Sequence, residues 1–321
     1  QQMIITTTGK IASDFYAVGH ASVPVYVLDG ADPVLFDAGF SGLAFVYEKG
    51  IREILGSRSP AYLFLTHSHW DHIGSAAHFK KCWPHMKIAG SSRIRDVLEH
   101  PAAIKRISSL SEDSLETLGS WGVTDINKTP FQSFRLDMTL APAKPVKLAG
   151  GTEIHPLSTP GHTWDSYSYW IPSRQILIAG EAVVCDGICE FLVDYDQYQH
   201  SLRKLSKLDV NVLCTGHHTV VTGKQAREYI VDSMAQTEAY LKLVEKLAEE
   251  EHGNLEKIVE RIKAMEWDNR PLPKQPERAY VMNTRIRVKN IIRSERSHGR
   301  RSERSRGNMP VPRLQGPNML E

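Results

Sequence analysis

Residues 66–72 read Thr-His-Ser-His-Trp-Asp-His, and they follow an apolar run at 61–65 that is typical of a buried strand. Four side chains of types that bind metals fall within six positions: His67, His69, Asp71 and His72. In an extended segment, residues two apart point to the same side, so His67 and His69 face one ion. Asp71 and His72 then face a second ion nearby. Imidazole nitrogens and carboxylate oxygens suit Zn²⁺, and also Mn²⁺ or Fe²⁺.

Three later segments repeat one arrangement, in which a strand ends in a glycine turn that presents a metal-binding side chain. Glycine lets the backbone turn sharply and approach an ion closely. The segments are Thr-Pro-Gly-His-Thr with His162, Ile-Ala-Gly-Glu-Ala with Glu181, and Cys-Thr-Gly-His-His with His217. His218 is a second candidate for the last ligand. The Gly-His pair favours His217, and we expect His218 to bond backbone or substrate.

The spacing and order of these motifs resemble the metallo-β-lactamase superfamily over roughly residues 11–222. The resemblance implies an α/β fold of the αββα sandwich type, two mixed sheets with helices on both outer faces. It also implies two divalent metal ions, Zn in the first place and Mn or Fe as alternatives. The first ion would be held by His67, His69 and His162, and the second by Asp71, His72 and His217.

The family normally has an aspartate that bridges both ions, and Glu181 stands in its place. Because glutamate is longer by one methylene, either the backbone at Gly180 sits further back or the carboxylate binds the metals differently. An acid or base role without bridging is the alternative for Glu181. Asp37 matches a family aspartate that lies behind the metal site and is not usually a ligand.

The resemblance further implies a metal-dependent hydrolase in which a metal-bound hydroxide attacks an ester, thioester, lactone or phosphoester of a small molecule. Asp71 would orient the hydroxide and move its proton. Two alternatives remain open, a persulfide dioxygenase-like oxidoreductase with a single iron and a binding or regulatory protein with slow turnover. Trp70, Trp164 and Tyr167 flank the motifs and are candidate substrate contacts, with core packing as the competing interpretation for each.

Strand-like runs dominate up to residue 222, and helical periodicity dominates after residue 224. We therefore expect a core over 1–222, a helical extension over 223–292 and a basic low-complexity tail over 293–321. The extension resembles that of quinolone-signal thioesterase members, in which C-terminal helices cover the active site. Residues 91–148 are interpreted as an insertion that forms one wall of a pocket. Arg287 is expected on a solvated helix face, with contact to an anionic group as the alternative.

Positive charge is concentrated at the end of the chain. Residues 293–321 hold seven arginines and three glutamates, a net +4, whereas all 321 residues sum to +2, so the preceding part carries about −2. This distribution favours a small-molecule substrate over nucleic acid. The sequence contains no apolar run long enough to span a membrane, no secretion signal at its start and only four scattered cysteines. We expect a cytoplasmic protein without a membrane partner, and leave a homodimer open.

Overall fold

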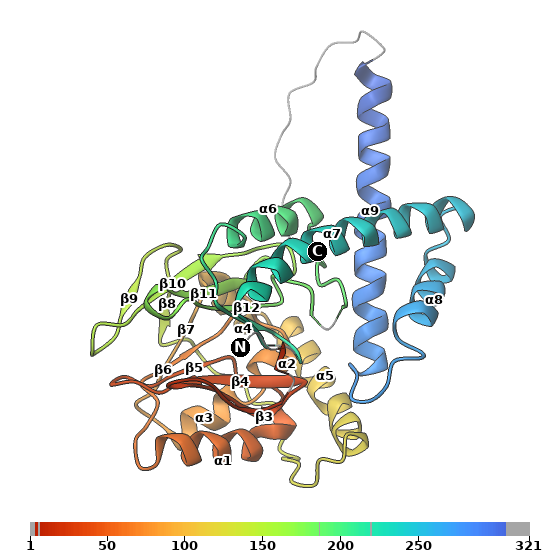
Figure 1. Ribbon diagram of the computed structural model, residues 1–321. Coiled ribbons are helices and arrows are strands. Elements are labelled where there is room, and N and C mark those ends of the chain that lie inside the picture. Colours follow the sequence, from red (N-terminus) through yellow and green to blue (C-terminus); the bar gives the residue numbers. More distant parts are fainter. Residues whose placement is uncertain (1–3, 6, 186, 219, 306–321) are drawn as a thin grey trace.

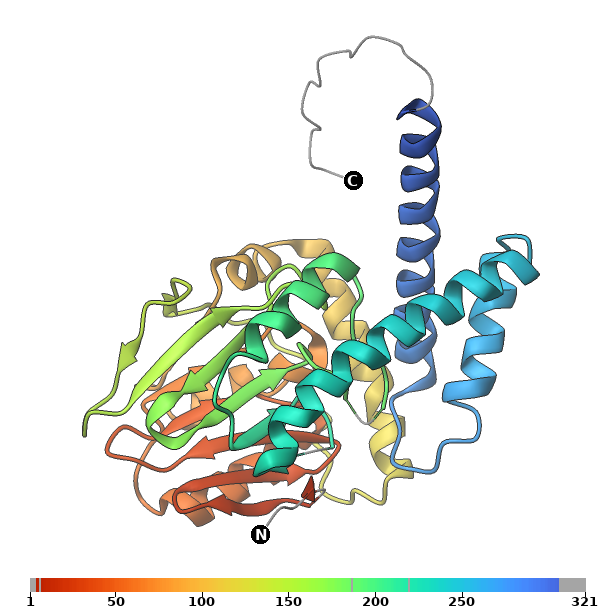
Figure 2. The ribbon, with the colours of Figure 1, turned by 45° about the horizontal axis from the view of Figure 1, so that its top comes forward.

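The structure is a computed structural model that describes residues 4–5, 7–185, 187–218 and 220–305. Within these residues, two seven-stranded sheets lie face to face and helices cover their outer faces (Figures 1 and 2). A core of aromatic and aliphatic side chains from both sheets fills the space between them. The αββα sandwich expected from the sequence is thus confirmed.

The first sheet has the order β2-β3-β4-β5-β6-β7-β8. Strands β2 to β5 pair antiparallel, as expected for a meander with turn-length connections, and β5 to β8 pair parallel. All of β4 is buried, which fits its run of Val, Tyr and Leu. The strands are β2 (Gly9–Ala12), β3 (Phe15–His20), β4 (Val23–Leu28), β5 (Val34–Phe36), β6 (Tyr62–Phe64), β7 (Lys87–Gly90) and β8 (Met138–Thr139).

The second sheet has the order β1-β14-β13-β12-β11-β10-β9. Its β12 and β13 pair parallel and its other neighbours antiparallel. The strands are β1 (Ile4–Ile5), β9 (Val146–Lys147), β10 (Glu153–Ser158), β11 (Tyr167–Ile171), β12 (Ile176–Gly180), β13 (Val212–Thr215) and β14 (Val220–Thr222). Two tyrosine hydroxyls join the sheets next to the metal motifs: Tyr169 donates to Leu65 O at 2.6 Å and Tyr26 to Thr215 O at 2.7 Å.

Helices α1 (Ala44–Leu55) and α3 (Ala76–Cys82) cover the first sheet, and α6 (Tyr195–Leu205) lies over the second (Figure 1). Helix α1 buries Ala44, Tyr47, Ile51 and Leu55, which share one face at helical spacing. Asp194 caps α6 by accepting a hydrogen bond from Gln197 N. The insertion 91–148 contains α4 (Ser92–Leu98) and α5 (Pro101–Ser120), while α2 (Trp70–Ile73) is a single turn inside the metal motif.

Three further helices form a C-terminal arm, α7 (Lys224–Glu250), α8 (Leu255–Glu266) and α9 (Glu277–Ser305). Helix α7 crosses the second sheet and projects beyond the sandwich, where α8 and α9 pack beside it (Figure 2). Helix α9 continues through Ser305, so the start of the expected low-complexity tail is helical; residues 306–321 lie outside the described part of the chain. None of the described helices combines the length and apolar character needed to cross a bilayer.

Candidate metal centre

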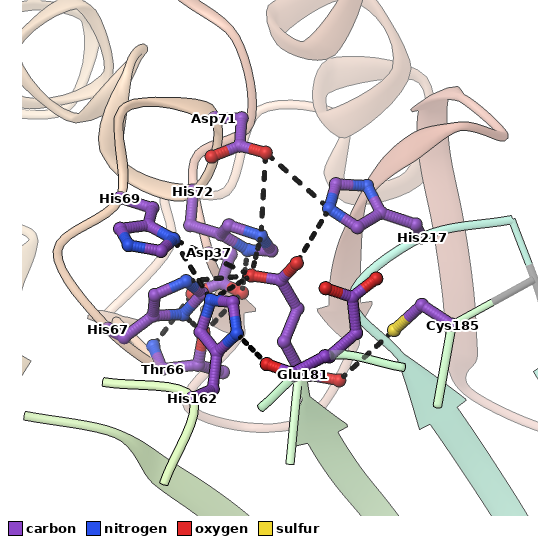
Figure 3. A network of polar contacts seen from close by, with 12 residues as sticks. Asp37, Thr66, His67, His69, Asp71, His72, His162, Glu181, Cys185 and His217 are labelled. Carbon is purple, nitrogen blue, oxygen red and sulfur yellow. Dashed lines mark hydrogen bonds and ion pairs between the residues drawn. The ribbon is translucent and has the colours of Figure 1, made fainter. Parts of the chain in front are cut away.

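The predicted ligands come together at one edge of the sandwich, although they lie up to 150 positions apart in the sequence (Figure 3). The motif of residues 66–72 follows β6 of the first sheet. The turns with His162, Glu181 and His217 follow β10, β12 and β13 of the second sheet. The candidate site therefore exists only because both sheets end at the same edge.

The first cluster contains His67, His69, His162 and Glu181, whose ligand-type atoms all lie within 4.8 Å of one another. Glu181 Oε2 lies 2.9 Å from His67 Nε2, 2.8 Å from His162 Nε2 and 3.8 Å from His69 Nδ1. His69 Nδ1 and His162 Nε2 are 3.0 Å apart. Three imidazoles thus converge on one carboxylate oxygen.

The second cluster contains Asp71, His72 and His217. His217 Nε2 lies 3.4 Å from Asp71 Oδ2, and His72 Nε2 lies 4.0 Å from the same oxygen. Glu181 contacts this cluster too, with Oε1 3.3 Å from His217 Nε2 and Oε2 3.3 Å from His72 Nε2. The glutamate carboxylate therefore lies between the two clusters.

Hydrogen bonds on the outer side of the rings orient the imidazoles. The Nδ1 atoms of His72, His162 and His217 donate to Asp37 Oδ2 at 2.9 Å, to Glu190 O, and to Ser22 O at 2.7 Å. Carboxylate and carbonyl oxygens only accept, so these rings carry a hydrogen on Nδ1 and direct Nε2 to the centre, where either a proton or a metal can occupy it. This is the ring orientation that a metal ligand needs.

Asp37 lies behind the site, as the resemblance implied, and accepts several hydrogen bonds there. Its buried carboxylate accepts hydrogen bonds from Thr66 N at 2.7 Å, Thr66 Oγ1 at 2.8 Å and His72 Nδ1 at 2.9 Å. Because Thr66 Oγ1 donates to Asp37, it accepts from His67 Nδ1 at 3.0 Å. One carboxylate thus fixes a ring of each cluster.

The site fits a cation. Three of its atoms are buried and have no hydrogen-bond partner among the described residues: His67 Nε2, His72 Nε2 and Glu181 Oε2. Lone pairs that face one another in a buried site repel unless a positive charge lies between them. Nitrogen and carboxylate oxygen donors suit Zn²⁺, Mn²⁺ or Fe²⁺.

The charges of the site agree with this fit. Burial opposes ionisation of Glu181, but His162 and its neighbours hold the pKa of that carboxyl well below its usual range. Burial lowers the pKa of His67 and of His162. For His72, Asp37 and Asp71 outweigh burial and raise the pKa to about 10. The carboxylates therefore attract positive charge, and a divalent cation would replace protons there.

A cavity opens beside the second cluster. Asp71 and His217 form part of its wall, together with Cys185 and the adjacent His218. Trp121, which follows α5, lines another part, so the insertion contributes one residue to the wall. The segment 267–276 between α8 and α9 closes the cavity from the C-terminal arm.

The three aromatic residues expected to contact substrate do not line this cavity. Trp70 is buried against Phe40, with ring centroids 4.7 Å apart, and Tyr167 is buried with its hydroxyl bonded to Leu140 O. Trp164 is 48% exposed. The short helix α2 points Asp71 and His72 toward the site and the Trp70 ring into the core. The aromatic rings that line the cavity are Phe40, Trp121 and Trp267. No sequence motif marks them, because they lie far apart in the chain.

Helix α9 supports the loop behind His162. Arg287, expected on a solvated face, is buried and donates to Cys189 O and to Thr284 Oγ1. Asn290 Nδ2 donates to Leu192 O at 2.6 Å. Between these two anchor points lies Glu190, whose carbonyl accepts from His162 Nδ1. The expectation for Arg287 was wrong because the loop needs a donor at a position that helical spacing alone does not reveal.

In a comparison with known protein families, residues 18–217 match the metallo-beta-lactamase superfamily. A Caenorhabditis elegans protein named beta-lactamase-like protein 2 homolog is 23% identical over 67% of this chain and 62% of its own length. Hydroxyacylglutathione hydrolase of Bartonella tribocorum is 30% identical over 48% of this chain and 47% of its own. The chain thus spans less than two thirds of these curated relatives.

Solved structures share the fold. A metallo-beta-lactamase family protein of Thermus thermophilus superposes with a TM-score of 0.63 at 17% identity, over 86% of this chain and 89% of the other. The FEZ-1 metallo-beta-lactamase of Legionella gormanii superposes with a TM-score of 0.56 at 18% identity, over 74% of this chain and 95% of the other. Similarity at this level of identity concerns the fold alone.

Proposed function

Because this chain belongs to the metallo-beta-lactamase superfamily, we propose that it is a hydrolase that uses two divalent cations to cleave a small-molecule substrate. One observation carries the proposal. The Glu181 carboxylate lies within 3.3 Å of imidazole nitrogens from both clusters. His67 Nε2, His72 Nε2 and Glu181 Oε2 are buried there without a hydrogen-bond partner among the described residues. We favour Zn²⁺ in both positions, with Mn²⁺ or Fe²⁺ as alternatives.

Cations held by these residues would acidify a water and polarise the bond to be cleaved. We assign Asp71 as the residue that orients the attacking water and accepts its proton. It is the one carboxylate of the two clusters that lines the cavity. The bonds from Asp37, Ser22 and Glu190 hold the rings in place while charge changes at the centre. No nucleophilic side chain is needed.

Within the expected range of esters, thioesters, lactones and phosphoesters, we favour a thioester. The Bartonella relatives are named hydroxyacylglutathione hydrolases, and substrates of that name carry a thioester. The aromatic lining of the cavity supports a substrate with an apolar or ring-bearing part.

Metal analysis and a substrate panel test the proposal together. Protein purified without added metal should contain about two equivalents of Zn or Mn, and should hydrolyse at least one member of an ester, thioester, lactone and phosphodiester panel. His67→Ala should lose metal and turnover, whereas His155→Ala, which changes a histidine outside the clusters whose ring bonds Glu153, should keep both. A single iron with oxygen consumption on glutathione persulfide, or full turnover in metal-depleted His67→Ala, would overturn the proposal.

A further inference from the structure

The segment 267–276, here named the connector, joins α8 to α9 and has a fixed shape. Trp267 Nε1 donates to Gln275 O at 3.0 Å, which closes the connector on itself. Arg270 N donates to Trp267 O at 3.1 Å, and Lys274 Nζ donates to the same oxygen at 3.0 Å. The Lys274 ammonium also lies 3.6 Å from the centroid of the Trp267 ring. The connector is therefore a preformed part of the cavity wall.

Two cationic side chains of the connector, Arg270 and Lys274, line the cavity that contains Asp71 and His217. Lys274 forms its hydrogen bonds with carbonyl oxygens, those of Trp267 and Asp268. Within the described part of the chain, no carboxylate forms an ion pair with this ammonium. The charge of this ammonium is therefore not neutralised by a carboxylate of the described residues, although carbonyl oxygens and the Trp267 ring hold it in place.

Aromatic rings lie on the walls of the same cavity. The Phe40 and Trp121 ring centroids are 5.7 Å apart, and Trp267 lines the cavity from the connector. A second, more open groove lies next to it, and Arg270 and His218 line both spaces. Aromatic rings and the two connector cations therefore line one cavity together with Asp71 and His217, and Arg270 lines the outer groove as well.

From this arrangement we propose that the connector is an anion-binding subsite, and that the substrate carries a carboxylate or phosphate group separated by an apolar segment from the bond that is cleaved. This inference rests on the proposed function, because it places the cleaved bond at the metal centre. Lys274 and Arg270 bind the anionic group. A guanidinium and an ammonium suit either a carboxylate or a phosphate.

Binding of uncleavable ligands tests the subsite without turnover. Calorimetry on the metal-loaded protein would compare 3-(benzylthio)propanoate with its neutral amide, and 2-(benzylthio)ethyl phosphate with the corresponding alcohol. Each anion should bind at least about tenfold more tightly than its neutral partner, the effect of one charge-assisted hydrogen bond. The preference should fall below about threefold in Lys274→Gln/Arg270→Gln and return in Lys274→Arg/Arg270→Lys. It should persist in Lys242→Gln, which removes an exposed lysine on α7.

The outcomes separate the subsite from the metal. If the anion preference survives unchanged in the double glutamine variant, the anion binds at the metal centre and the proposal is wrong. Equal affinity of anion and neutral partner in the wild type also overturns it. Hydrolysis is a separate measurement: S-benzoyl thioesters of 3-mercaptopropanoate and of N-acetylcysteamine should differ in KM through Lys274 and Arg270. Connector-dependent binding without cleavage of any panel substrate refutes the hydrolase and leaves the subsite standing.

Discussion

Replacing Asp37 by asparagine changes one oxygen of a buried carboxylate into an NH₂ group and keeps the shape of the side chain. The amide oxygen can still accept from Thr66 N, now 2.7 Å from the carboxylate. The NH₂ group then faces Thr66 Oγ1 and His72 Nδ1, which lie 2.8 Å and 2.9 Å from Oδ2. The threonine hydroxyl can rotate and accept, but His72 Nδ1–H meets a second donor.

His72 relieves that clash by moving its hydrogen from Nδ1 to Nε2, the atom that points to Glu181 Oε2 at 3.3 Å. A protonated Nε2 has no lone pair for a metal. Loss of such an orienting bond typically costs about 10- to 100-fold in metal affinity, or about 1.4 to 2.7 kcal/mol. We expect this loss of metal affinity at the cluster of Asp71, His72 and His217, and a smaller loss at the cluster that contains His67.

The assay is a Zn²⁺ titration of metal-free protein against a chromophoric chelator, which resolves two affinities. Asp37→Asn should weaken one of them by about 10- to 100-fold. The control is Asp29→Asn, which removes a carboxylate that pairs with Arg58 away from the site. Circular dichroism of each metal-free variant checks that the fold is kept. Two unchanged affinities in folded Asp37→Asn would refute the role of Asp37 in orienting His72.

Three further outcomes are expected. Chelation should lower the melting temperature, and Zn²⁺ at about 1,000 times its Kd should restore about 4 kcal/mol of the free energy of unfolding. A melting temperature that neither treatment changes would contradict a metal centre. Gly216→Ala should weaken metal binding without changing the secondary structure, because a Cβ there would lie 2.9 Å from Glu181 Cγ and 3.1 Å from His72 Cε1. Unchanged metal content would show that these two side chains can move to make room for the methyl group. Burial, with Glu48 beside it, raises the pKa of Cys82 to about 11. A raised pKa keeps the thiol protonated in the folded state, so alkylation of Cys82 at pH 9 should be slower than in urea and should accelerate as the pH approaches 11, with Cys82→Ser as the blank.

The fold was predictable because its signals are local. The short apolar strands and the long amphipathic helix that begins near Lys224 follow from hydrophobic periodicity. The helical course of α9 beyond residue 292 was not predicted, because composition alone suggested a tail with few apolar groups. The aromatic residues beside the motifs do not line the cavity for a related reason. Position beside a motif does not fix where a side chain points, and α2 turns the Trp70 ring into the core.

The sequence by itself determined the candidate ligands, because both of their signals are local: histidines close together in the chain, and a glycine turn directly after a strand. Only the tertiary structure decided that Glu181 reaches between both clusters, because that depends on how β12 and β13 align with the loop after β6. The tertiary structure also decided which residues line the cavity. Phe40, Trp121 and the connector meet there through packing of the insertion and the C-terminal arm, and such contacts between distant segments leave no periodic signal in the chain.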